Sequence, residues 1–404
     1  MDGKAVHDGS FTLAFSGPAV NFNDGEVKRV PANIKLPTIE EVRAVIPKHC
    51  FEASAMRGFA YIFRDLSVIA TFGFSAYLLL DPAMPSVWQD PLVFAKWFIG
   101  WNVYGFWQGT AFVGLWSIGH HCGHGAFSSS PVLSDIVGYV LHTGLLTPYF
   151  SWQFSHKKHH AYTNHLRDGE GNVPITATGF GIRPDSKHIG LAALSDALGH
   201  EQIGIITNVV TLLIGWPLYL LKNNDGFDHF RPSSKLFPER LRTKIAVSTA
   251  GILAVVGLLI WAYFAHGVWA VYNFYFLPYA WNNIWIIAYS KLNHVNVDVP
   301  HYGDDEWNWM RGTLATVDHS CGIFDWFHHK TGSTHVVHHI SAKIPWYHLD
   351  EATIHVRNKL GRLHNYDSRP WYKFLYHTAL QCDFVDSLVG VQYYKSFGDL
   401  IKRK

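Results

Sequence analysis

Long apolar runs interrupt the polar segments of this chain, and four of them predict membrane-spanning helices. These runs cover residues 66–80, 97–118, 245–264 and 270–290. The run 97–118 has 22 residues without a charged side chain. At about 1.5 Å of rise per residue its helix would be about 33 Å long, enough to cross a hydrocarbon core of about 30 Å. No Asp, Glu, Lys or Arg occurs in the 46 residues from Ile245 to Ser290, which predicts two spans turning near residues 265–269.

Other parts of the chain are less apolar. The run 66–80 has 15 residues and can span only if its helix begins before Arg64 and Asp65. The run 136–150 is too short to cross, and we expect it in the membrane interface. Residues 1–56 are mixed and polar, and predict an irregular cytosolic segment that ends in a short amphipathic helix around residues 38–46. The membrane domain would then cover residues 57–404.

Composition supports a membrane protein and excludes several other classes. Of the 404 residues 48% are hydrophobic and 16% are charged, whereas soluble domains have about 25% charged residues. A net charge of +2 gives no indication of a nucleic-acid partner. The four cysteines form no Cys-x-x-Cys pair, so neither a disulfide framework nor a zinc ribbon is predicted. Two acids in the first eight residues argue against a secretory signal or a transit peptide.

Histidine is the anomaly of the composition. Of 26 histidines, nine fall in three tight clusters. The clusters are "GHHCGHG" with His120, His121 and His124, "SHKKHH" with His156, His159 and His160, and "STHVVHH" with His335, His338 and His339. Residues at i, i+3 and i+4 of a helix share one face, so each cluster is expected to project its imidazoles together. The eight histidines other than His121 are too many for one tetrahedral zinc ion and suit two metal ions.

A shared metal site constrains the topology. All three clusters must then lie on one side of the membrane, and the two pairs of predicted spans each return the chain to its starting side. The run 202–221 must therefore not cross, and Pro217 near its end favours a broken or interfacial helix. The alternative is that 202–221 crosses and the clusters are unrelated. The segment 222–244 holds six Lys and Arg residues and the loop 81–96 holds one, which places the clusters and both termini in the cytosol.

The ligand chemistry points to iron. Soluble di-iron bundles use Glu-x-x-His pairs, but none of the nine glutamates here stands three residues before a histidine. An imidazole-rich site is predicted instead. A membrane location suggests an apolar substrate, and iron with oxygen can attack an unactivated C–H bond, which zinc cannot. A polytopic haem protein or metal transporter is the alternative outside this class, but such proteins place single ligands near mid-membrane.

Several motifs resemble those of the membrane fatty acyl desaturases of the methyl-end group. They run from "IPKHCFE" at Ile46 through "CGHGAFS", "TPYFSWQFSHKKHH", "GWPLYL", "ATVD" and "THVVHH" to "IPWYHLDEAT". The resemblance implies an all-α integral membrane protein with about four transmembrane helices, interfacial helices and a cytosolic helical cap that carries a histidine-ligated di-iron site. It adds His294 of "KLNHVN" as a ninth candidate ligand. The family has Glu or Asp where this chain has His121. His121 would either orient a ligand imidazole, as the acid would, or bind metal itself.

The resemblance also implies the reaction. An O2-dependent enzyme of the endoplasmic reticulum membrane would introduce a cis double bond into a phospholipid-linked or CoA-linked acyl chain. We favour Δ12 desaturation of oleate to linoleate. The omega-3 activity is the main alternative, favoured by the "GHHCGHG" motif and by Leu349 of "YHLDEAT". Hydroxylases, epoxygenases and acetylenases share the histidine motifs. The chain has no Gly-x-Gly-x-x-Gly or His-Pro-Gly-Gly motif. The resemblance implies that a separate cytochrome b5 and NADH-cytochrome b5 reductase supply the electrons.

Overall fold

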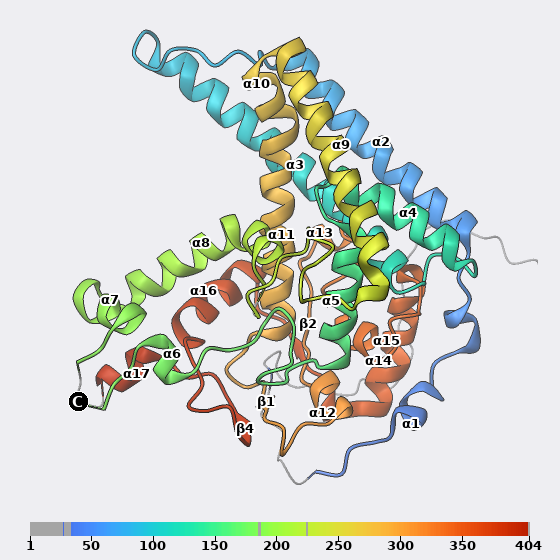
Figure 1. The fold of residues 1–404 in the computed structure, drawn as a ribbon, viewed down its shortest axis with the longest axis vertical. Coiled ribbons are helices and arrows are strands. Elements are labelled where there is room, and N and C mark those ends of the chain that lie inside the picture. Colours follow the sequence, from blue (N-terminus) through green and yellow to red (C-terminus); the bar gives the residue numbers. More distant parts are fainter. Residues whose placement is uncertain (1–26, 28–33, 185–186, 224, 403–404) are drawn as a thin grey trace, which may run out of the picture.

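The computed structural model describes residues 27, 34–184, 187–223 and 225–402, and this part of the chain is mainly helical (Figure 1). The longer helices are α2 (Ala55–Leu79), α3 (Pro91–Gly123), α4 (Pro131–Gly144), α5 (Tyr149–Ala161), α8 (His200–Leu221), α9 (Arg242–His266), α11 (Leu277–His294), α15 (Trp346–Leu360) and α16 (Trp371–Gln381). The shorter ones are α1 (Ile39–Arg43), α6 (Ala177–Phe180), α7 (Gly190–Leu198), α10 (Val268–Val271), α12 (Trp309–Leu314), α13 (Phe324–Phe327), α14 (His335–Ile340) and α17 (Phe397–Lys402). Single turns form η1 (Lys48–Phe51), η2 (Glu239–Leu241), η3 (Tyr272–Phe276) and η4 (Gly361–Leu363).

Four long helical segments stand together above a broader body: α2, α3, α9 and the continuous α10–η3–α11 (Figure 1). They contain the four predicted spans. The first begins at Ala55, ahead of Arg64 and Asp65, so the 15-residue run becomes a helix of 25 residues. The last two turn at Gly267, within the predicted turn. The fold class predicted from the resemblance, an all-α membrane protein, is confirmed.

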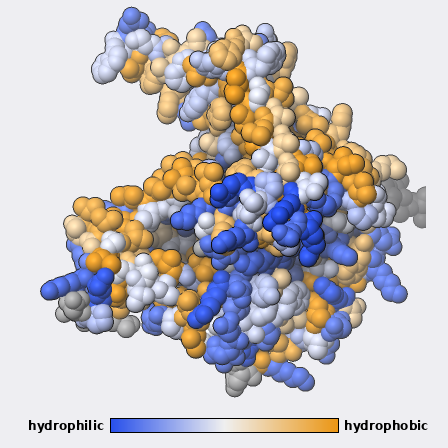
Figure 2. All heavy atoms as spheres, viewed as in Figure 1, coloured by the Kyte–Doolittle hydropathy of each residue, from blue (hydrophilic) through white to orange (hydrophobic). Residues whose placement is uncertain are grey.

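Helix α8 has the length and composition of a span but not its direction. Among the described residues, three helices are long and apolar enough to cross a membrane by length and composition alone: α2, α8 and the segment Glu239–His266. Figure 1 shows α8 lying across the lower end of the long helices rather than alongside them. Its exposed face carries Ile206, Val210 and Leu213, and Figure 2 shows apolar side chains over this region as well as along the long helices. An interfacial position for α8 remains our prediction.

The body below the long helices combines short helices with two small sheets. Strand β1 (His301–Tyr302) pairs antiparallel with β4 (Val391–Gln392), and β2 (Asp318–His319) pairs parallel with β3 (Tyr366–Asp367). The largest buried cluster packs α14 and α15 against the lower end of α3 and against the segment that precedes α2. This packing brings the N-terminal and C-terminal parts of the chain to the ends of α3 and α11, where the histidines lie.

Two local predictions can be compared with the structure. The amphipathic helix expected around residues 38–46 is the short α1, which begins with a capping box between Thr38 and Glu41. The apolar run 136–150 is divided between α4 and α5, because α4 ends at Gly144 and Pro148 caps the start of α5. Residues 1–26 and 28–33 of the predicted N-terminal segment lie outside the described residues.

Candidate metal centre

Four helices deliver the clustered histidines to one place. His120 lies in the last turn of α3 and His124 caps its end. Helix α5 carries the second cluster, α14 carries the third, and His294 is the last residue of α11. Thus all nine candidate ligands come from helix ends or short helices directly below the long helices. They form two separate sets.

The five-histidine set gathers nitrogen atoms from all three clusters. Its members, with ligand atoms within 4.8 Å of one another, are His120, His124, His156, His160 and His338. The Nε2 atom of His120 lies 2.9 Å from that of His338 and 3.0 Å from that of His156. The Nε2 atom of His160 lies 3.1 Å from that of His156.

The four-histidine set lies beside the first. His159, His294 and His339 bring their ligand atoms within 4.8 Å of one another. His335 joins them, because its Nε2 atom lies 2.9 Å from Nε2 of His294 and 3.0 Å from Nε2 of His339. The rings of His160 and His339 stack with centroids 4.0 Å apart, so the two sets are in contact.

This geometry fits two metal ions better than a hydrogen-bonded network. A neutral imidazole has one N–H, and several Nε2 atoms meeting at one point cannot all be donors and acceptors to each other. Octahedral ligands with bonds of about 2.1 Å stand about 3.0 Å apart, close to the measured Nε2 separations. His124 Nε2 is buried and has no hydrogen-bond partner among the described residues. A cation at the centre of each set would accept the nitrogen lone pairs that converge there.

The buried environment keeps these imidazoles neutral. Burial and then the neighbouring imidazoles lower the pKa well below its usual value at His156, His160, His338 and His339. Burial lowers the pKa of His159 to about 4 and that of His335 to about 3. The neutral form is the one that offers a lone pair to a metal ion, so the site is ready to bind metal at neutral pH.

Contacts from outside the clusters orient several of the rings. His159 Nδ1 lies 2.8 Å from the backbone carbonyl oxygen of Glu170, and His339 Nδ1 lies 3.1 Å from the Thr163 hydroxyl. Glu170 is in the segment 167–174. Tyr219 and Asn223 donate hydrogen bonds to its carboxylate. Partners of this kind fix the ring orientation and tautomer of metal-binding histidines. No motif in the sequence indicated this contact.

Helix α14 is held in place by a buried aspartate that sequence reasoning also missed. Asp318 Oδ1 accepts a hydrogen bond from the backbone N–H of Val336, in the first turn of α14, at 2.8 Å. Its Oδ2 atom lies 2.7 Å from Nε2 of His364. Asp318 and His364 side chains are both fully buried. The "ATVD" motif was the available signal, because a charged residue ends an otherwise uncharged stretch there.

His121 lies beside the five-histidine set without joining it. It is buried, its ring centroid lies 5.2 Å from that of His338, and it packs against Trp346 at 5.5 Å. It belongs to neither group of converging ring nitrogens among the described residues. This arrangement favours the orienting role over the metal-binding one, and that assignment is a proposal.

An apolar cavity reaches both sets from the side of α8 and α11. Its volume is about 370 Å³, within the range of small-molecule sites of about 300–1,000 Å³. Trp116, Trp152, Trp216, Ile286 and Ile287 form much of its apolar wall, whereas Glu170, Asn172, Lys222, Ser290 and Lys291 make one part polar. His120 and His156 line it from one set, and His159, His294 and His335 from the other. A long apolar molecule with a polar head suits this lining.

A second opening reaches the histidines from another side. It measures about 550 Å³ and is lined by His124, His160 and His339 together with three basic residues, Arg43, Lys157 and Lys343. The two sets are therefore approached through an apolar cavity and, separately, through a basic opening. Such a division would let an apolar substrate and a second, charged partner reach the same centre.

Comparison with known proteins identifies the family. The family model described as fatty acid desaturase matches residues 95–370. The chain belongs to the fatty acid desaturase family. Curated relatives of this desaturase include a Δ12 fatty acid desaturase of Mortierella isabellina, 35% identical over 90% of this chain and 92% of the relative. A Δ12 fatty acid desaturase of Vernicia fordii is 37% identical over 89% and 91%, and an oleoyl-12-hydroxylase of Ricinus communis is 35% identical over 89% and 89%.

An acidic residue at position 121 is expected to leave metal binding of this desaturase unchanged. The His121→Glu variant should keep the metal content of the wild-type enzyme, because no His121 nitrogen converges with either set. Its turnover should be equal or higher, since a carboxylate can orient a ligand imidazole by a hydrogen bond. Metal per chain, measured by mass spectrometry on the purified variants, checks this prediction. Loss of metal from both His121→Glu and His121→Asp would assign His121 as a ligand instead.

Proposed function

We propose that this desaturase converts an oleoyl chain to a linoleoyl chain by Δ12 desaturation, with two iron ions held by the two histidine sets. The observation that carries the proposal is the pair of imidazole sets at the wall of one apolar cavity. The Δ12 names of the relatives support the position of the bond. One O2, two electrons and two protons enter, two hydrogens leave the acyl chain at C12 and C13, and two water molecules form.

Different residues would bind the iron ions, line the cavity and contact the acyl carrier. When bound, the iron pair supplies O2 activation and C–H cleavage. The nine histidines would hold the two ions: His120, His124, His156, His160 and His338 one of them, and His159, His294, His335 and His339 the other. Trp116, Trp152 and Trp216 line the cavity and exclude water from the acyl chain. Lys222 and Lys291 at its polar part would meet the acyl carbonyl or a phosphate group of the acyl carrier.

Electrons would enter through the basic opening. Cytochrome b5, reduced by NADH-cytochrome b5 reductase, is the partner that we propose, with an acidic face meeting Arg43, Lys157 and Lys343. This opening suits electron entry better than the basic segment 222–244, because His124, His160 and His339 line it directly. We place the enzyme in the endoplasmic reticulum membrane, with the histidines and both termini in the cytosol.

A 12-hydroxylase is the second candidate, because the Ricinus relative carries that activity in its name and is as similar as the desaturases. The same cavity and histidine sets would serve it. The omega-3 activity stays the alternative within desaturation. The product therefore decides among the three.

Expression in a yeast that contains oleate but no polyunsaturated lipid is expected to yield linoleate. The reason is that an oleoyl chain is apolar along its length, so its position in the cavity must select C12. Gas chromatography and mass spectrometry of fatty-acid methyl esters give the bond position directly.

Cells that carry the empty vector are the control. Linolenate formed only after feeding linoleate would replace the Δ12 assignment with omega-3. A hydroxylated or acetylenic product would keep the metal centre and change the reaction.

A further inference from the structure

A group of side chains that could hold a metal ion lies outside the histidine centre. His49, Cys50, His348 and Glu351 bring one ligand atom each to within 4.8 Å of one another. The first two are in η1, ahead of the first long helix, and the last two are one turn apart on α15. About 300 residues of sequence separate the two halves. The mechanism of desaturation uses none of the four.

Two measured distances within this group lie near those of a tetrahedral site. Cys50 Sγ lies 3.7 Å from His49 Nε2, and His49 Nε2 lies 2.9 Å from Glu351 Oε2. Around a zinc ion with Zn–N of about 2.1 Å and Zn–S of about 2.3 Å, neighbouring N and S ligands stand about 3.6 Å apart. The His49–Glu351 pair would open slightly, from a hydrogen-bond distance to about 3.4 Å. Only a small adjustment of two half-exposed side chains is needed.

The donor set suits zinc. One soft thiolate, two borderline imidazoles and one hard carboxylate are all ligands that zinc accepts in tetrahedral sites. A thiolate and a carboxylate together cancel the charge of Zn²⁺. We propose that His49, Cys50, His348 and Glu351 form a structural zinc site that fastens the segment 34–54 to α15.

The Cys50 side chain is buried, and its Sγ faces His49 Nε2. Arg57 is the opposing feature, because its Nη1 atom lies 3.4 Å from His348 Nε2. Its guanidinium also lies over the Tyr347 ring, so it has a place to remain when His348 turns to a metal ion.

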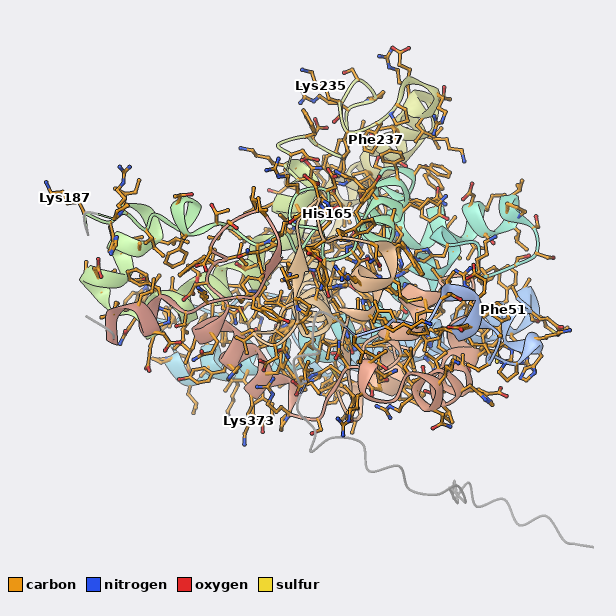
Figure 3. All side chains as sticks on the ribbon, turned by 90° about the horizontal axis from the view of Figure 1, so that it is seen from below. Phe51, His165, Lys187, Lys235, Phe237 and Lys373 are labelled. Carbon is orange, nitrogen blue, oxygen red and sulfur yellow. The ribbon has the colours of Figure 1, made fainter. Side chains whose placement is uncertain are left out.

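The proposed zinc site would help to shape the basic opening to the histidine centre. Phe51, next to Cys50, and Arg43 both line that opening, and Arg43 donates two hydrogen bonds to the Ile340 carbonyl oxygen at the end of α14. Figure 3 labels Phe51 at the edge of the body, on the N-terminal segment. Fixing η1 to α15 would therefore keep this wall of the opening in a constant position relative to the third histidine cluster.

Metal analysis of the full-length enzyme tests the proposal. The protein is purified in detergent through a tag that contains no histidine, from cells grown with added iron and without added zinc, and zinc and iron are measured by mass spectrometry. About one zinc ion per chain is expected. The Cys50→Ser and Glu351→Gln variants should each retain about tenfold less zinc. Their iron content should match that of the wild type, because neither residue touches the histidine sets.

Two controls keep the result specific. His355→Ala, an exposed change on the same helix, and Cys382→Ser, a thiol elsewhere in the body, should keep the zinc. Cobalt added to zinc-depleted enzyme should give a thiolate-to-cobalt charge-transfer band that Cys50→Ser abolishes.

Wild-type enzyme without zinc and without that band on cobalt addition would overturn the proposal, as would unchanged zinc in both site variants. If a variant fails to accumulate, the wild-type measurements still decide. The zinc site does not depend on the proposed Δ12 reaction, so zinc content remains readable whichever lipid product is found.

Discussion

Alanine in place of His338 or His335 is expected to abolish product formation while the protein still accumulates in membranes. Each change removes one nitrogen from a set of converging imidazoles, His338 from the five-histidine set and His335 from the four-histidine set. A fall in activity of about 100-fold or more is expected, with the loss of about one iron ion per chain. Product analysis in yeast and iron measurement on purified protein check the two parts separately.

The same loss of activity and iron is expected when any of the other seven candidate ligands is changed to alanine. His355→Ala is the matched control, because this exposed histidine on α15 lies outside both sets. The control should keep wild-type iron and activity. Near wild-type activity in three or more of the ligand variants would refute the assignment of the two sets as iron sites.

The helical spacing of the histidines was readable from the sequence, but their division between two sets was not. We expected the imidazoles at positions i, i+3 and i+4 of a cluster to project together from one helix face. In the structure His156 and His160 belong to one set and His159 to the other. The third cluster divides in the opposite sense, with His335 and His339 in the four-histidine set and His338 in the other.

The physical reason for this division is angular. Residues i+3 and i+4 of a helix differ in direction by about 100°. One short helix can therefore direct an i, i+4 pair at one ion and its i+3 residue at a second ion. A sequence pattern fixes only the directions around each helix. How α5 and α14 face one another depends on tertiary packing, which determines which ring meets which.

The residues that hold the site were harder to predict than the ligands. The partner of His159 is a backbone carbonyl of Glu170, which carries no side-chain signal. The group of His49, Cys50, His348 and Glu351 joins positions far apart in sequence. Local apolarity picks out α2 and α9 but also α8, which lies across the long helices (Figure 1), whereas the turn at Gly267 was predicted to within two residues. Local sequence patterns predict helices and turns, whereas contacts between distant residues become visible only when the helices are packed together.

Asp318→Ala is expected to cause the second large loss, through the third histidine cluster. The change leaves the Val336 backbone N–H and the His364 ring without their buried partner. Two unsatisfied buried polar groups cost about 2–4 kcal/mol of the free energy of unfolding. Because Val336 is in the first turn of α14, that helix should lose its fixed position, and bound iron should fall. The midpoint of thermal unfolding in detergent and the iron content per chain measure both effects.

Asp318→Asn is the matched variant that separates a hydrogen-bonding role from a purely steric one. Its side-chain oxygen can still accept from Val336, and its amide can donate to His364 Nε2 if the ring carries its proton on Nδ1. In that tautomer the Nδ1–H has no acceptor among the described residues, which costs part of the stability. We expect Asp318→Asn to fall between the wild type and Asp318→Ala in iron content and thermal stability, because the Val336 N–H keeps its acceptor. Equal iron and stability in the alanine variant and the wild type would show that α14 is positioned by its apolar contacts with α15 and not by Asp318.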